Sequence, residues 1–172
     1  MPDHLKHGLT LAGLIALVAV GALWGWGALT KPFPKLSGSD QTSPCVEVAV
    51  SEGDKVRPSQ VWVSVLNASD RVGLASVTLD KLVERGFGKG DTGNAPNDAK
   101  VRLAEVWTAD VSNPAAQLVR SQFGAVRIVA HPELGSRVVV VVGKQFQDLK
   151  KGRDFVAARG DATICSPRDT GV

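Results

Sequence analysis

The feature that most constrains this chain is an uncharged, apolar run near its N-terminus. Residues 8–29 carry no charge, and Thr10 is the only clearly polar side chain among them. As an α-helix the run would be about 33 Å long, enough to cross a hydrocarbon core of about 30 Å. Two tryptophans near its C-terminal end stand where aromatic residues mark a membrane interface. The run predicts a transmembrane helix over residues 8–30, preceded by a short cytoplasmic segment, residues 1–7.

A cleaved signal peptide is the alternative interpretation of this run. Val20, Gly21 and Ala22 offer the small residues of a cleavage site, but the apolar run continues beyond them, which favours a retained anchor. Gly21 and Gly25 also have the GxxxG spacing of packed membrane helices. They are candidate contacts with another helix, although glycine is common in such segments.

The two cysteines decide the predicted orientation, because basic residues flank the run on both sides. Cys45 and Cys165 lie near the two ends of the remaining chain, and neither belongs to a metal-binding or redox motif. A disulfide between them would tie the C-terminal tail to the stem and would need an oxidising compartment. Two unrelated buried thiols are the alternative. We therefore expect the N-terminus inside and the folded part outside the cell membrane.

The rest of the chain has the composition of a globular domain with short attachments. Hydrophobic residues make up 44% and charged residues 22%, and the net charge of +3 is too small to indicate nucleic-acid binding. Residues 31–59 are predicted to form a linker or stem with a short strand at 46–50, since they begin with a stretch rich in Pro, Gly and Ser. Residues 150–172 are predicted to be a C-terminal tail held by the disulfide.

Between the stem and the tail, the pattern of apolar residues predicts an α/β fold. A helix should start near Leu74 and end at Gly86, and a second should have Pro114 at its first position. The predicted strands are 61–66, 100–107, 125–130 and 138–142, and residues 88–98 are predicted to be a loop with at most a short edge strand. The result is a two-layer β-α-β-α-β-β module, one sheet packed by two helices.

Several short motifs in this module resemble the C-terminal domain of LytR-type envelope proteins. The resemblance covers residues 60–149, and it extends to the valine-rich strand followed by Gly143 and Phe146. The motifs, in order, are Val65-Leu66-Asn67-Ala68-Ser69, Gly73-Leu74-Ala75, Arg85-Gly86-Phe87 and Gly93-Asn94-Ala95-Pro96.

The chain is similar to short stand-alone members of this family in actinobacteria, including mycobacterial cell-envelope-integrity proteins. Such forms have one N-terminal membrane helix and lack the LytR-CpsA-Psr phosphotransferase domain. The resemblance implies a non-enzymatic role that binds or scaffolds the components attaching glycopolymers to peptidoglycan. The expected partners are the membrane, wall glycopolymer or peptidoglycan, and wall-assembly proteins, with no nucleic acid, cofactor or metal.

Four basic residues are candidate contacts for an anionic polymer or a partner: Lys144, Lys150, Lys151 and Arg153. A solvated charged face is the plainer interpretation of the same group. Two other functions stay open, an assembly subunit acting through its transmembrane helix and an enzyme with an unrecognised site on the same fold. Ser69, Asp70 and His131 would be the residues of such a site, but a helix cap and a turn explain them.

Overall fold

The computed structural model describes residues 45–168 of the chain. The predicted cytoplasmic segment, the helix over 8–30 with Gly21 and Gly25, and the linker up to residue 44 lie outside the described residues. From residue 45 to residue 168, no helix has the length and apolar character needed to cross a membrane.

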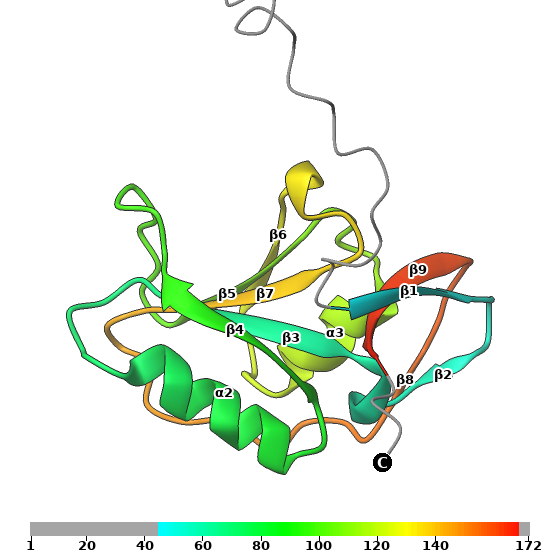
Figure 1. The fold of residues 1–172 in the computed structure, drawn as a ribbon, viewed down its shortest axis with the longest axis horizontal. Coiled ribbons are helices and arrows are strands. Elements are labelled where there is room, and N and C mark those ends of the chain that lie inside the picture. Colours follow the sequence, from blue (N-terminus) through cyan, green and yellow to red (C-terminus); the bar gives the residue numbers. More distant parts are fainter. Residues whose placement is uncertain (1–44, 169–172) are drawn as a thin grey trace, which may run out of the picture. The chain divides into compact units, whose positions relative to one another are not determined.

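The centre of the domain is a mixed five-stranded sheet in the order β4-β3-β7-β5-β6 (Figure 1). Strand β3 runs parallel to both β4 and β7, whereas β5 is antiparallel to β7 and parallel to β6. It follows that β3 and β6 run in opposite directions. The C-terminal end of β3 therefore lies at the same end of the sheet as the N-terminal end of β6, and the C-terminal end of β6 lies at the other. The strands are β3 (Trp62–Asn67), β4 (Gly88–Asn94), β5 (Ala104–Thr108), β6 (Arg127–Ala130) and β7 (Val138–Val142).

Two helices, α2 (Leu74–Glu84) and α3 (Pro114–Ser121), each connect a pair of parallel neighbouring strands. Both contribute buried side chains to one core, which contains every second residue of β7. Because alternate strand residues face the same side, both helices must pack on one face of the sheet. The mixed α/β fold with two helices is therefore confirmed. The shared core residues are Leu79, Leu82, Leu118, Val119, Val138, Val140 and Val142.

The helix ends follow the local signals in the sequence. Asn113 caps α3, since its side-chain oxygen accepts a hydrogen bond from the Ala115 amide at 3.0 Å, and Pro114 occupies the first helical position. Beyond the end of α2, Gly86 has a φ of 88°, a left-handed conformation that favours glycine. This glycine turns the chain into β4.

Two predicted boundaries differ from the structure. Residues 88–98 were predicted as a loop with at most a short edge strand, and seven of them, residues 88–94, form the edge strand β4, whose polar sequence reflects pairing on one side only. The strand predicted over 100–107 begins only at Ala104. Before that residue, the carbonyls of Arg102 and Leu103 accept hydrogen bonds from the turn after β7 rather than from a strand.

The segments on either side of the module pair with each other. Strand β1 (Cys45–Val50) is antiparallel to β9 (Ala162–Pro167), and the two-residue β2 (Lys55–Val56) is antiparallel to β8 (Val156–Ala157). The β1–β9 pair, called the ribbon below, lies beside the sheet in Figure 1. Short 3-10 turns stand at η1 (Pro58–Gln60) and η2 (Pro132–Leu134). The predicted tail thus contains two strands.

A disulfide joins the two strands of the ribbon. Cys45 and Cys165 are 120 residues apart in sequence, their Cα atoms are 5.5 Å apart, and both side chains are buried. Ile164 and Val56 are fully buried in the same core as the sheet and helices. The cysteine pairing expected from the sequence is present, and the bond supports an extracytoplasmic location for the domain.

Candidate functional site

The structure separates the four basic residues that the sequence grouped together. Lys144 lines a hollow at the C-terminal ends of β3 and β4, together with Asn67 and Asp70. Lys150 lines a different hollow beside Phe146. Only Lys151 and Arg153 share one hollow, so they are the pair that the fold brings together.

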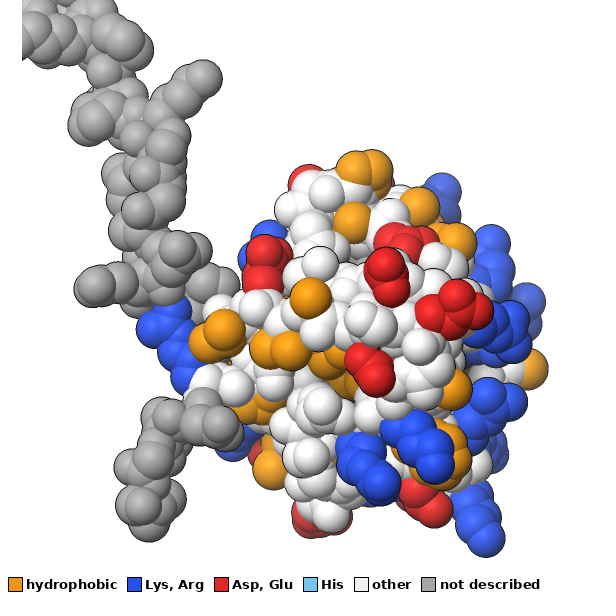
Figure 2. All heavy atoms as spheres, turned by 90° about the vertical axis from the view of Figure 1, so that its right-hand side faces the viewer, with side chains coloured by type: hydrophobic (Ala, Val, Ile, Leu, Met, Phe, Trp, Pro, Cys, Tyr) orange, Lys and Arg blue, Asp and Glu red, His pale blue; other side chains and the backbone are white. Residues whose placement is uncertain are grey.

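Lys151 and Arg153 belong to a surface that we call the basic groove, which consists of two adjoining hollows that share Arg153. The first has a volume of about 500 Å³ and the second about 330 Å³. Lys and Arg side chains gather along one flank of the side of the domain that carries β8 and β9 (Figure 2). The basic residues that line the groove are Arg85, Arg120, Lys151, Arg153 and Arg159, and the only carboxylate is that of Asp154.

A buried amide fixes the floor of the basic groove. Gln122, at the C-terminal end of α3, is only 3% exposed. Its Oε1 accepts a hydrogen bond from Arg85 Nη1 at 2.8 Å, and its Nε2 donates to the Arg153 carbonyl at 3.2 Å. The Gln122 carbonyl accepts from the Lys150 amide at 2.7 Å. The loop 150–153 is therefore held against the ends of both helices.

Two further contacts hold the same loop. Ser121 Oγ accepts a hydrogen bond from the Arg153 amide at 3.0 Å, and Arg85 also donates to the Lys150 carbonyl. Gly152 lies so close to the Gln122 amide group that a Cβ atom would clash with it. Glycine is needed here for close approach rather than for an unusual backbone conformation.

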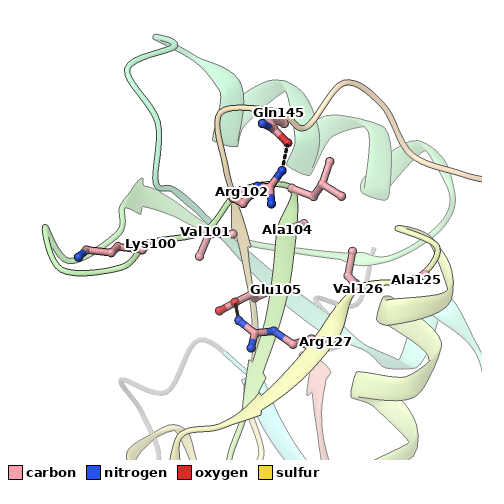
Figure 3. A pocket seen from close by; sticks show the side chains of 10 residues that line it. Lys100, Val101, Arg102, Ala104, Glu105, Ala125, Val126, Arg127 and Gln145 are labelled. Atoms are coloured by element: carbon pink, nitrogen blue, oxygen red, sulfur yellow. Dashed lines mark hydrogen bonds and ion pairs between the residues drawn. The ribbon is translucent and has the colours of Figure 1, made fainter.

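Another hollow, called the β5–β6 groove, lies where these two strands begin (Figure 3). It has a volume of about 340 Å³. Two of its charged groups neutralise each other. Glu105 forms an ion pair with Arg127 and accepts a hydrogen bond from Trp107 Nε1 at 3.1 Å. Arg102 donates to Gln145 Oε1 at 3.4 Å. Figure 3 shows Lys100 standing apart from these pairs.

The three residues suggested for an enzyme site, Ser69, Asp70 and His131, are not brought together. Ser69 follows β3 and donates its hydroxyl hydrogen to Asn67 Oδ1 at 2.8 Å, while His131 follows β6. The two residues follow strands that run in opposite directions, so they lie beyond opposite ends of the strands of the sheet. His131 instead stacks on Trp107 with ring centres 4.2 Å apart, and its Nδ1 lies 2.9 Å from Glu133 Oε1.

Among the described residues, Glu133 and Asp148 have lowered pKa values, and neither carboxyl group lines the basic groove or the β5–β6 groove. A backbone hydrogen bond, followed by the contact with His131, lowers the pKa of Glu133. The hydrogen bond from Lys81 lowers the pKa of Asp148, and the Leu149 amide adds to that effect. Within the described part of the chain, no three His, Cys, Asp or Glu side chains are grouped as a metal site would require.

The sequence could not reveal most of the basic groove. Lys151 and Arg153 are close in sequence, but Arg85 ends α2, Arg120 lies in α3 and Arg159 follows β8. Their convergence depends on how the helices pack against the loop 150–153. The cluster of basic residues in the sequence thus contains two of the residues that line this surface, Lys151 and Arg153.

Comparison with known proteins relates this fold to one family. The family described as the LytR cell envelope-related transcriptional attenuator matches residues 60–146, about half of the chain and nearly the same segment that carries the resemblance in the sequence. No curated protein gives a significant match.

One solved structure is similar to this fold. It is the crystal structure of the soluble domain of a conserved hypothetical secreted protein from Mycobacterium marinum, an ortholog of Rv2700. The similarity has a TM-score of 0.51 and 22% sequence identity, over 60% of this chain and 70% of that chain. At this identity it shows a shared fold.

Proposed function

Because the chain belongs to the family of the LytR cell envelope-related transcriptional attenuator, we propose that it is a non-enzymatic accessory protein of the cell envelope. It supports envelope integrity by binding or scaffolding the components that attach glycopolymers to peptidoglycan. A helix over residues 8–30 tethers it to the cell membrane with the N-terminus inside. The folded domain then stands on the outer side, among the polymers and enzymes of the wall.

The family match over residues 60–146 is the observation that carries this proposal. The disulfide between Cys45 and Cys165 supports it, because such bonds persist in oxidising compartments outside the cytoplasm. Both grooves lie on the surface of the module, and hydrogen bonds between the loop 150–153 and the residues Gln122 and Ser121 hold the wall of one of them, which suits a protein that acts by binding. Ser69 and His131 follow strands that run in opposite directions, so they do not support the particular enzyme site that the sequence suggested.

Crosslinking in intact cells, followed by a pull-down of the full-length chain from membranes, tests this function. We expect wall-assembly enzymes or peptidoglycan fragments to be enriched, and a deletion strain to have a more permeable wall. A normal permeability together with no enrichment of wall components would show that the proposal is wrong.

A matched variant separates this function from assembly through the membrane helix. Replacing residues 8–30 by an unrelated transmembrane helix removes Gly21 and Gly25 while the domain is unchanged. If the domain carries the function, the same wall components are recovered with this variant. Loss of all partners would instead favour an assembly subunit that acts through its helix.

A further inference from the structure

We infer that the basic groove binds an acidic glycopolymer, a polysaccharide that carries phosphate or carboxylate groups along its length. This inference rests on the proposed function and names the ligand class and the surface that meets it. The polymer lies along the two hollows, from Arg85 at one end to Arg159 at the other, and passes Arg153 where the hollows join.

The charges of the basic groove are available to a ligand. The side chains of Arg120, Lys151, Arg153 and Arg159 make no hydrogen bond or ion pair with any residue in the range 45–168. With one carboxylate among five cations, the groove has an excess of positive charge that attracts anions. The β5–β6 groove has a smaller excess, because Glu105 neutralises Arg127 there and leaves two cations, Lys100 and Arg102.

The groove is also pre-formed. Gln122 and Ser121 hold the backbone of the loop 150–153, and Arg85 is fixed by Gln122 and the Lys150 carbonyl. A ligand therefore has to order only the ends of the basic side chains, not the loop that carries them. Since ordering of a loop opposes binding, a fixed loop favours affinity for a polymer with weak individual contacts.

The shape and location of the surface favour a polymer over a lipid bilayer or a nucleic acid. The cations line two joined hollows, which fits an extended chain better than a flat layer of headgroups. The disulfide supports a location outside the cytoplasm, away from nucleic acids. Phe155 stands between Asp154 and Val156 in the sequence and is 41% exposed, and Lys55 Nζ lies 4.9 Å from the centre of its ring. An exposed ring of this kind can pack against the carbon face of a sugar.

Binding of defined polymers to the full-length chain in detergent tests this inference. Polygalacturonic acid presents carboxylates and long-chain inorganic polyphosphate presents phosphates, while dextran is a neutral control. The groove variant changes Arg120, Lys151 and Arg153 to Gln. We expect this variant to bind the acidic polymers about 30-fold more weakly. The figure is the product of a loss of about threefold for each of the three exposed charges. The salt dependence of binding should become shallower as well.

The matched control has the same loss of charge at other positions. It changes Lys89, Lys100 and Arg102 to Gln, two of which line the β5–β6 groove. We expect its affinity to stay within about twofold of the unaltered chain, because screening limits the effect of distant charges. Equal losses in the two variants, or equal binding of dextran, would overturn the assignment to the basic groove.

A further arm distinguishes polymer from membrane. Vesicles of phosphatidylglycerol and phosphatidylcholine replace the polymers, and Phe155→Ala is compared with the unaltered chain. Binding to vesicles but not to acidic polymers, lost in F155A, would overturn the inference in favour of a membrane surface. If the chain binds no acidic polymer yet still recovers wall-assembly enzymes by crosslinking, the inference fails while the proposed function stands.

Discussion

The central sheet and the ribbon are held together by different means. Every residue of β7 is buried, and the strands on either side belong to local β-α-β units whose helices cover one face. In the ribbon, by contrast, Val46 and Val48 are 46% and 37% exposed, and pairing joins residues more than 100 positions apart. Burial of apolar surface can hold the sheet. The ribbon buries less apolar surface and has a covalent link between its two strands, from Cys45 to Cys165.

Removing the disulfide is the strongest test of this comparison. We expect the double variant Cys45→Ala and Cys165→Ala to lose about 4 to 5 kcal/mol of unfolding free energy, the chain-entropy value for a loop of this length. Hydrogen exchange should increase first in β1 and β9, while the amides of β3 and β7 stay protected. Urea unfolding followed by circular dichroism measures the first effect, and exchange mass spectrometry measures the second.

The comparison would fail if the ribbon and the sheet lost protection together. That outcome would mean that the core shared through Ile164 and Val56 makes the two parts one cooperative unit even without the disulfide. The single variant Cys165→Ala is not a suitable control, because it leaves a free thiol. Reduction of the unaltered chain by a small thiol gives an independent comparison.

The same contrast explains how much could be predicted from the sequence. The strands 61–66 and 138–142 and both helices were predicted because local apolar patterns and caps encode them, and the family resemblance is confirmed. Strand β4 was predicted as at most a short edge strand and is seven residues long, since an edge strand with the sequence GKGDTGN has no apolar pattern that would show its length. Strands β8 and β9 were missed because their partners lie at the other end of the chain.

The candidate site was predictable only in part, for a similar reason. Lys151 and Arg153, which line one hollow, could be grouped from the sequence because they are close in it. Gln122 carried no signal, because its role comes from burial at the end of α3, beside a loop 30 residues later in the chain. A buried amide that holds a basic loop becomes visible only once both helices are packed on the sheet.

Overpacking at the turn after β7 tests how strongly tight packing holds the central sheet. A Cβ at Gly143 would clash with the backbone carbonyl of Val101, which cannot rotate away as a side chain does. We expect Gly143→Ala to lower the unfolding free energy by about 2 kcal/mol. Gly160→Ala is the matched control, since nothing lies within 4 Å of its Cβ position, and we expect a change within about 0.5 kcal/mol. Thermal unfolding of both variants checks this.

The junction between the ribbon and the sheet should respond less strongly. A Cβ at Gly88 in β4 would meet the ring of Pro167 at the end of β9. The contact is with side-chain atoms of Pro167, near the end of the described chain. The Pro167 ring can therefore shift more readily than a backbone carbonyl inside the fold. We expect Gly88→Ala to cost about 1 kcal/mol, measured by urea unfolding. A loss as large as that of Gly143→Ala would show that the junction is as rigid as the sheet.

The smallest effect concerns the segment that leads from the sheet to the ribbon. Lys81 of α2 contacts Asp148 at 2.9 Å and is the main cause of the lowered pKa of that carboxyl. In Lys81→Gln we expect the Asp148 pKa to rise toward its ordinary value of 3.8, although the Leu149 amide keeps part of the shift. A carboxyl whose pKa is lowered by folding adds stability above its unfolded pKa and loses it as the pH falls through the folded pKa. The unaltered chain should therefore be slightly more stable than K81Q at neutral pH and equal to it in acid. NMR titration of the carboxyl groups measures the shift of the Asp148 pKa, and Lys100→Gln is the control. An unchanged Asp148 pKa in K81Q would mean that Lys81 does not hold this segment to α2.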